Sequence, residues 1–169
     1  GIFSNITHDH LDYHKTFAAY IAAKKRFFDE LPPEAFALTN ADDRNGRVMV
    51  QNTRAKVRTL SLRSAADFRC RIAELHPDGM LLRIDGREVW VRLLGRFNAY
   101  NLLSAYAAAL LLGFDRDEVL RVLSTLAPVS GRFECVRAAD GTTAIVDYAH
   151  TPDALENVLR TIAEIRRPG

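Results

Sequence analysis

The chain has 169 residues, 48% of them hydrophobic, and a formal net charge of +2. This length fits one substantial core, or one compact unit with part of another. So small a charge argues against nucleic-acid binding, which depends on a concentrated basic surface. The longest apolar run, at residues 107–112, is far shorter than the about 20 residues that cross a bilayer, so we expect no membrane contact.

The two cysteines, Cys70 and Cys135, lie far apart in the chain and form no Cys-x-x-Cys motif. This spacing indicates neither a zinc site nor a disulfide framework, and we expect a cytoplasmic location. The first residue is Gly1 rather than methionine, and a dense motif starts only four residues later. We therefore expect the chain to be a segment of a longer protein.

Residues 5–14 read NITHDHLDYH and gather three histidines with two aspartates. Imidazole nitrogens and carboxylate oxygens are common protein ligands of divalent cations. The cluster therefore predicts metal chemistry near this end of the chain.

Residues 16–31 carry apolar side chains at three- and four-residue steps, which predicts an amphipathic helix. Lys24 falls in the apolar row, whereas its neighbours Lys25 and Arg26 project toward the polar side. Two interpretations are open. The stem of Lys24 packs on the apolar face while its ammonium reaches water, or the amine is buried, often neutral and reactive beside the metal cluster.

The middle of the chain predicts a mixed sheet. Short apolar runs at residues 36–39 and 57–62 are typical of strands, with a polar turn and a helix expected between them over residues 43–53. Residues 68–94 alternate apolar and polar positions around Asp85-Gly86, which predicts a hairpin with a two-residue turn. We expect a small antiparallel insert on an α/β fold.

Two helices are expected next. The alanine- and leucine-rich stretch at residues 98–112 has Asn98 as its expected N-cap and Gly113 as its stop. A second helix follows to residue 126, where Asp115 and Glu118 have the spacing of a capping box.

Residues 128–131 read PVSG and form the best boundary candidate, so we expect one domain over 1–128 and the start of another over 129–169. Beyond the boundary, strand-like segments lead to a helix with Thr151 as its cap and Pro152 in its first turn. This order suits the opening of a second α/β domain.

Four phrases, in this order, carry a family resemblance: NITHDHLDYH at 5–14, YIAAK at 20–24, GRFNAYN at 95–101 and DYAHTPDAL at 147–155. The chain resembles the Mur ligases, ATP-dependent amide-forming enzymes of peptidoglycan precursor synthesis, and most closely their tripeptide-forming branch. The resemblance spans nearly the whole chain. It covers the rear of the family's central ATPase domain and the start of its C-terminal domain.

The resemblance implies roles for six residues. His10 corresponds to a magnesium ligand, and Lys24 to a lysine that carbon dioxide converts to a carbamate, an oxygen ligand that magnesium accepts. Asn98 and Asn101 correspond to residues that hold the nucleotide base. Arg132 and Asp147 correspond to residues that meet the phosphate and ribose of ATP. His150 lies in the same phrase and receives no role.

The implied parent enzyme uses ATP and Mg²⁺ to add a diamino acid, meso-diaminopimelate or L-lysine, to UDP-N-acetylmuramoyl-L-alanyl-D-glutamate through an acyl phosphate. We expect that parent to be a monomer. These 169 residues contain no Gly-x-x-x-x-Gly-Lys-Ser/Thr phosphate loop, so we expect the chain alone to be inactive.

Two other functions are compatible with the residues. A metal-dependent hydrolase could use the ligands at 8–14 to activate water, although it leaves Lys24, Asn98 and Asn101 without a task. A noncatalytic remnant that binds nucleotide or metal would explain the missing phosphate loop.

Overall fold

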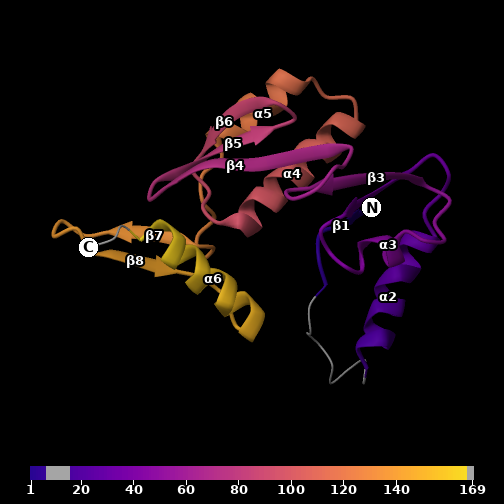
Figure 1. The fold of residues 1–169 in the computed structure, drawn as a ribbon, viewed down its shortest axis with the longest axis horizontal. Helices are drawn as coiled ribbons and strands as arrows, with labels where there is room; N and C mark the ends of the chain where they lie inside the picture. Colours follow the sequence, from indigo (N-terminus) through magenta and orange to yellow (C-terminus); the bar gives the residue numbers. More distant parts are fainter. Residues whose placement is uncertain (7–15, 167–169) are drawn as a thin grey trace.

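The computed structural model describes residues 1–6 and 16–166, and most of them surround one six-stranded sheet (Figure 1). Its strands, in spatial order, are β1 (Ile2–Phe3), β2 (Phe36–Asn40), β3 (Lys56–Ser61), β4 (Phe68–His76), β5 (Gly79–Ile84) and β6 (Arg87–Val91). Strands β1 to β4 pair in parallel, and β4 to β6 pair antiparallel. The expected mixed sheet is confirmed, and the antiparallel strands extend its parallel part.

Four helices accompany this sheet: α2 (Phe17–Asp29), α3 (Gly46–Met49), α4 (Arg96–Leu111) and α5 (Arg116–Thr125). Strand β2 contributes to two cores, because Leu38 belongs to the cluster with Leu103 of α4, while Ala37 belongs to the cluster with Phe28 of α2. Burial on both faces explains why β2 is a continuous apolar run rather than an alternating one. Among the described residues, no helix is both long and apolar enough to cross a bilayer.

The predicted hairpin is confirmed between β5 and β6. Asp85 and Gly86 have φ angles of 45° and 85°, the positive values that a two-residue type I′ turn requires. Ile84 pairs with Arg87 across the turn. This register keeps Leu82 buried in the main core. The cysteines are both free, with Cys70 buried in that core and Cys135 half-buried outside the six-stranded sheet.

Helix α4 starts earlier than predicted, at Arg96, and Asn98 is not its N-cap. Gly95 takes that position with a φ of 92°, a backbone conformation that suits glycine. Asn98 lies inside the first turn, where its backbone N–H donates to Gly95 O (3.0 Å) and its Nδ2 donates to Leu94 O (2.8 Å). The cap prediction failed because the side chain bonds backward to the preceding loop.

The predicted stop of α4 is confirmed at Gly113, which has a φ of 90°. The N–H of Gly113 donates to Leu110 O, and the N–H of Phe114 donates to Ala109 O. This pair of bonds is the Schellman arrangement, which satisfies carbonyls at a helix end.

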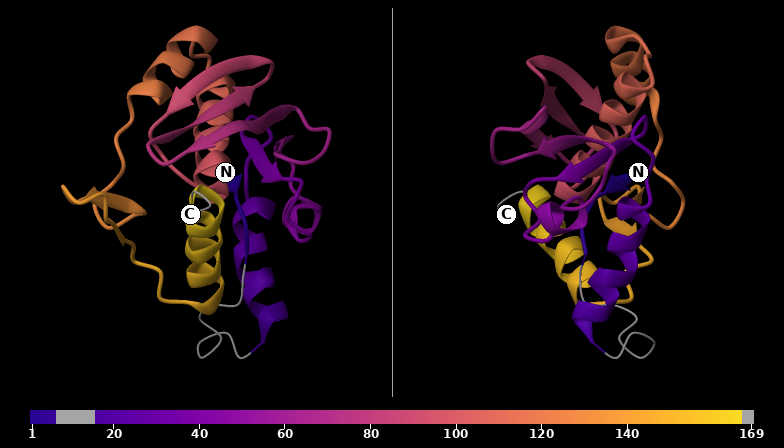
Figure 2. Two further views of the ribbon diagram at one scale, coloured as in Figure 1. Left: turned by 60° about the vertical axis from the view of Figure 1, so that its left-hand side comes forward. Right: turned by 90° about the vertical axis from the view of Figure 1, so that its right-hand side faces the viewer.

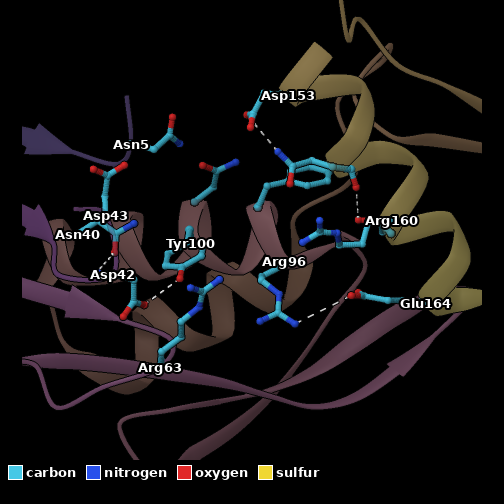
Figure 3. Close-up of a pocket in the computed structure, with 14 residues that line it drawn as sticks. Asn5, Asn40, Asp42, Asp43, Arg63, Arg96, Tyr100, Asp153, Arg160 and Glu164 are labelled. Atoms are coloured by element: carbon cyan, nitrogen blue, oxygen red, sulfur yellow. Dashed lines mark hydrogen bonds and ion pairs between the residues drawn. The ribbon is translucent and has the colours of Figure 1, made fainter. Parts of the chain in front are cut away.

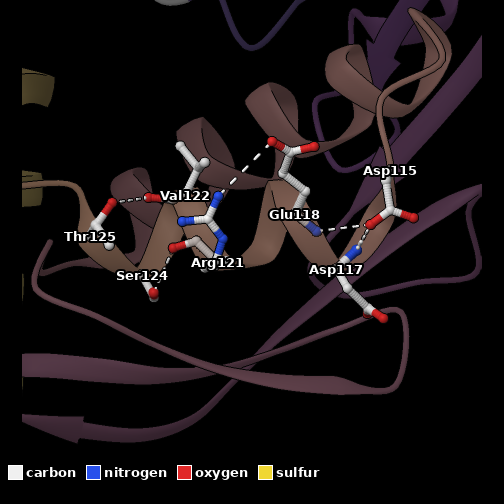
Figure 4. Close-up of polar contacts among 7 residues, drawn as sticks. All are labelled: Asp115, Asp117, Glu118, Arg121, Val122, Ser124 and Thr125. Carbon is white, nitrogen blue, oxygen red and sulfur yellow. Dashed lines mark hydrogen bonds and ion pairs between the residues drawn. The ribbon is translucent and has the colours of Figure 1, made fainter.

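Helix α5 begins at the predicted aspartate. Asp115 Oδ1 accepts the backbone N–H groups of Asp117 and Glu118, each at 3.0 Å (Figure 4). The Glu118 carboxylate lies 3.9 Å from Arg121. Half of the expected capping box is therefore formed by Asp115, and Glu118 turns along the helix instead.

Helix α3 is much shorter than the helix expected over residues 43–53. Asp43 Oδ1 accepts the N–H of Asn45, a local turn that competes with helix formation. Gly46 then starts the single turn of α3, with its Cα so close to Asn40 O that an added Cβ would lie 2.2 Å from that oxygen. Helix α3 is therefore a single turn that begins where the backbone of Gly46 passes close to Asn40 O.

The C-terminal segment contains a two-stranded antiparallel sheet, β7 (Glu134–Arg137) with β8 (Thr143–Val146), and helix α6 (Pro152–Ile165). Thr151 caps α6 as predicted, because its Oγ1 accepts the N–H of Ala154 at 3.3 Å. Figures 1 and 2 show α6 beside the N-terminal end of α4. An added Cβ on Gly95 would lie only 3.0 Å from Thr161 Oγ1, so the two helices are in close contact.

Candidate functional site

A cavity of about 480 Å³ lies between the N-terminal part of α4 and the C-terminal segment. We call it the α4–α6 cavity. Its lining residues come from the N-terminal strand region, the first turns of α4, the loop before β7, the end of β8 and the start of α6: Asn5, Leu93, Phe97, Asn98, Asn101, Val129, Arg132, Asp147, Thr151, Asp153, Ala154, Asn157 and Val158. Four residues singled out in the sequence, Asn98, Asn101, Arg132 and Asp147, therefore share one cavity.

Helix α4 places Asn98 and Asn101 on the same wall, because residues three apart lie on one helix face. Asn101 Nδ2 donates to Asn98 Oδ1 at 3.3 Å, and Asn98 Nδ2 donates to Leu94 O. These bonds fix the direction of both side chains. An amide side chain has two donors and an acceptor with two lone pairs, so the pair retains capacity for a ligand with both donors and acceptors.

On the wall formed by the C-terminal segment, the Asp147 carboxylate accepts two backbone hydrogen bonds. Its Oδ2 accepts the N–H of Phe133 at 2.8 Å, and its Oδ1 accepts the N–H of Ala149 at 2.7 Å. The carboxylate thereby ties the end of β8 to the loop before β7. Phe133 has a φ of 49°, an uncommon value for a residue with a side chain, and the bond from its N–H helps to hold that conformation.

Two sets of contacts hold Arg132 and the loop that carries it. Its guanidinium carbon is 5.4 Å from the centroid of the Tyr148 ring, within cation–π range. On the other side, Glu134 accepts the Gly131 N–H at 2.8 Å and the Ser130 hydroxyl at 3.0 Å. The Gly131 bond first, and then the Ser130 bond, hold the pKa of the Glu134 carboxyl below its ordinary value. A guanidinium on a braced loop suits an anionic ligand.

A second cavity of about 270 Å³ (Figure 3) adjoins the first. The two cavities share the lining residues Asn5, Phe97, Asn101, Asp153 and Asn157. Arginines from three parts of the chain, Arg63, Arg96 and Arg160, line it, and Figure 3 shows Tyr100 and Asp42 together in its wall. Arg96 lies 4.0 Å from Glu164 of α6. No sequence pattern singled out Asp42 or Tyr100 as a site residue, although Tyr100 stands inside the GRFNAYN phrase.

Lys24 is not turned inward as one of the sequence interpretations required. Its side chain is exposed on α2, and its ammonium lies 5.0 Å from the centroid of the Tyr20 ring. The helix buries Tyr20 and Phe28, and the positions between them on that row stay open to solvent. The apolar spacing predicted the helix correctly but extended the buried face too far.

His10, together with His8 and His14, lies outside the described residues, so its predicted metal role stays a prediction. Within residues 1–6 and 16–166, no three His, Cys, Asp or Glu side chains gather closely enough to form a cation site. His150, which received no role, is placed beside the site by the bond between its Nδ1 and Tyr148 O at 2.9 Å.

Comparison with known families and structures matches nearly the whole chain. Residues 1–109 match the Mur ligase middle domain, and residues 131–169 match the Mur ligase, glutamate ligase domain. The UDP-N-acetylmuramoyl-L-alanyl-D-glutamate--2,6-diaminopimelate ligase of Parabacteroides distasonis is 63% identical over 165 residues, which cover 98% of this chain and 34% of that protein. The ligase of the same name from Bacillus cereus is 37% identical, and the match covers 99% of this chain and 36% of that protein.

Solved structures agree with these matches. A UDP-N-acetylmuramoyl-L-alanyl-D-glutamate--2,6-diaminopimelate ligase superposes with a TM-score of 0.75 at 32% identity, covering 98% of this chain and 36% of the other. MurF from Acinetobacter baumannii superposes with a TM-score of 0.85 at 18% identity, covering 98% of this chain and 37% of the other. At this identity the match shows a shared fold alone. This chain spans about a third of the length of the relatives it matches. With its middle-domain match over more than half of the sequence, the chain belongs to the Mur ligase family.

Proposed function

We propose that this chain is part of an ATP-dependent ligase that adds a diamino acid to UDP-N-acetylmuramoyl-L-alanyl-D-glutamate in peptidoglycan precursor synthesis. The observation that carries the proposal is the meeting of Asn98, Asn101, Arg132 and Asp147 around one cavity. The names of the relatives, which specify 2,6-diaminopimelate, favour meso-diaminopimelate over L-lysine as the incoming amino acid.

Each wall of the α4–α6 cavity has a proposed task. Asn98 and Asn101 offer amide donors and acceptors to the edge of adenine. Arg132 offers its guanidinium to phosphate oxygens. Asp147 offers the remaining lone pairs of its carboxylate to the ribose hydroxyls, while its bonds to Phe133 and Ala149 keep it in place.

In the proposed reaction, an oxygen of the substrate carboxylate attacks the γ-phosphorus of ATP, and ADP leaves. The amino group of the diamino acid then attacks the acyl carbon, phosphate leaves, and the amine loses a proton as the amide forms. Arg132 would lower the energy of charge that develops on the transferred phosphoryl group. Orientation by Asn98 and Asn101 would align that group with the carboxylate.

Mur ligases use ATP and Mg²⁺. Within residues 1–6 and 16–166, no three His, Cys, Asp or Glu side chains gather into a cation site. We retain as part of the proposal that His10 and a carbamate on Lys24 contribute to holding it. The exposed side chain of Lys24 is accessible to dissolved carbon dioxide.

We also propose a boundary near residue 128, with the central domain over 1–128 and the C-terminal domain from 129. The family matches, which end at residue 109 and resume at 131, support this division. Helix α5 ends at Thr125, before the boundary. The phosphate loop that ATP binding requires would come from another part of the intact ligase, which we propose is a cytoplasmic monomer.

The test is ADP release by the intact ligase, measured with the muramoyl dipeptide and with either meso-diaminopimelate or L-lysine. We expect turnover only when dipeptide, ATP and meso-diaminopimelate are all present. Replacing Arg132 with Ala should lower kcat by about 10²-fold or more, whereas Arg132→Lys, which keeps the charge but loses the fork geometry, should retain more activity.

Other outcomes would contradict the proposal. ATP binding without ligation under every combination of substrates would favour a noncatalytic remnant. Chelator-sensitive phosphoester hydrolysis without amide formation would favour a hydrolase. Carbamylation has its own measurement, a carbamate signal in ¹³C NMR after labelling with ¹³C-bicarbonate, which should disappear in Lys24→Arg and persist in the neighbouring variant Lys25→Arg.

A further inference from the structure

Asp42, in the loop after β2, is a meeting point of four hydrogen bonds. Its Oδ1 accepts the hydroxyls of Ser61 (2.7 Å) and Ser64 (3.3 Å), and its Oδ2 accepts the N–H of Leu62 (2.7 Å) and the hydroxyl of Tyr100 (2.8 Å). The donors come from the end of β3, from the loop that follows it and from α4. One carboxylate thus joins two loops of the sheet to a helix.

The bond to Tyr100 reaches the part of α4 that lines the α4–α6 cavity. Tyr100 stands between Asn98 and Asn101 in the sequence. Among the described residues, the side chains of residues 96–104 donate several hydrogen bonds, and only the bond from Tyr100 has its acceptor outside residues 94–104. The others connect neighbouring positions of the helix and its entry loop.

The charges at this contact favour the same bond at neutral pH. Burial alone would raise the pKa of Asp42, but the bonds from Ser61, Leu62, Tyr100 and Ser64 together hold it below its ordinary value. Burial, and then the bond to Asp42, raise the pKa of Tyr100 well above its ordinary value. Asp42 is therefore an anionic acceptor and Tyr100 a protonated donor, the arrangement that makes a strong hydrogen bond.

We propose that Asp42 and Tyr100 are positioning residues, which set Asn98 and Asn101 of α4 at the angle needed to recognise the base of a bound nucleotide. The inference rests on the proposed function of the α4–α6 cavity. Tyr100 and Asp42 line the adjoining cavity rather than this one, so their effect passes through the orientation of the helix. A small rotation of α4 moves both asparagines together.

The experiment compares KM for ATP and for GTP in the intact ligase, with Asp42→Asn, Tyr100→Phe and the double variant. We expect each single variant to reduce the preference for ATP over GTP by about tenfold, the size of one lost hydrogen bond. The double variant should lose less than the sum of the two single variants, because both perturb the bond between Asp42 and Tyr100. A merely structural defect would lower the amount of active enzyme without changing the ratio between the two nucleotides.

Asp67→Asn is the matched control. Asp67 Oδ2 accepts the N–H and the hydroxyl of Thr59, so it is also a carboxylate with several bonds on the same sheet, but it has no hydrogen bond to α4. This variant should retain the ATP preference. Thermal unfolding of every variant identifies those that do not fold, and if Asp42→Asn is among them, Tyr100→Phe decides the question.

Asn101→Ala distinguishes the positioning role of Asp42 and Tyr100 from the proposed base site on α4. If it changes the nucleotide preference and neither Asp42→Asn nor Tyr100→Phe does, the positioning role is wrong and the proposed site stands. If Asn101→Ala and Asn98→Ala both leave the preference unchanged, the assignment of the base to α4 fails, and the positioning role fails with it.

Discussion

The six-stranded sheet and the C-terminal segment bury their side chains to very different extents. Leu82, Leu103 and Tyr106 have no exposed surface at all. In contrast, between residues 127 and 166 only Phe133 and Thr161 are buried. The α4–α6 cavity has one wall on each region. Half of the candidate site therefore stands on a packed core, and the other half depends on a few contacts.

Two contacts join the C-terminal segment to the region around the start of α4. The rings of Phe97 and Phe133 lie with their centroids 6.0 Å apart, and Thr161 packs against Gly95. Local stability follows the amount of apolar surface that a region buries. The wall with Arg132 and Asp147 should therefore open at a lower free energy than the wall with Asn98 and Asn101.

The largest effect is expected from a cavity in the sheet core. Leu82→Ala removes a fully buried side chain and should lower the free energy of unfolding by about 2–5 kcal/mol. Leu159→Ala on α6, where the side chain is 56% exposed, should change it by less than about 0.5 kcal/mol. Urea denaturation measures both, and equal losses would remove the contrast between the regions.

The next effect concerns the buried anchor of the C-terminal segment. Phe133→Ala should weaken the docking of that segment by about 3 kcal/mol, without unfolding the sheet. Hydrogen exchange should become faster at the amides of β7 and β8 and stay unchanged at those of β5. Equal acceleration in β5 would mean that the two regions unfold as one unit.

A smaller effect, about 1 kcal/mol each, is expected from removing a helix cap. Asp115→Ala should lower the stability of the sheet region, because α5 contributes Leu120 and Leu123 to the main core. Thr151→Ala should speed exchange in the first turns of α6 and leave the midpoint of global unfolding in place. A shift of that midpoint would show that α6 is coupled to the core more tightly than its burial indicates.

The smallest effect depends on pH and concerns Asp42. Because its folded pKa is lowered, the carboxylate contributes stability that is present above its unfolded pKa of about 3.9 and is lost as pH falls through the folded value. The stability difference between the native chain and Asp42→Asn should therefore be largest near neutral pH and shrink toward pH 3. A difference that grows on acidification would contradict this sign.

The sequence predicted those features that depend on neighbouring residues. The hairpin at Asp85-Gly86, the cap at Asp115 and the stop at Gly113 all follow from local backbone chemistry, and the structure contains each of them. Asn98, Asn101 and Asp147 were found because they stand in short recognisable phrases, and Arg132 because it stands in the segment GRFE at residues 131–134. Their individual roles remain predictions.

The features that the sequence did not predict depend on distant partners. Asp42 meets Ser61 and Tyr100, which are 19 and 58 positions away in the chain, so no local pattern marks it. Burial of Lys24 was one of two open interpretations, because helical spacing identifies a face but not how much of that face a neighbour covers. Asn98 was expected to cap α4, but its bond to Leu94 depends on the loop before the helix.

The burial of Cys70 has a practical consequence for optical experiments. Burial first, and then the nearby Asp85, raise the pKa of this thiol to about 12, and the side chain is 1% exposed. A maleimide dye reacts with accessible thiolates, so it should attach to Cys135 on β7 and leave Cys70 untouched. Of the two thiols in these 169 residues, Cys135 is therefore the accessible attachment point for a fluorophore, and it lies in the C-terminal segment that carries the more weakly anchored wall of the cavity.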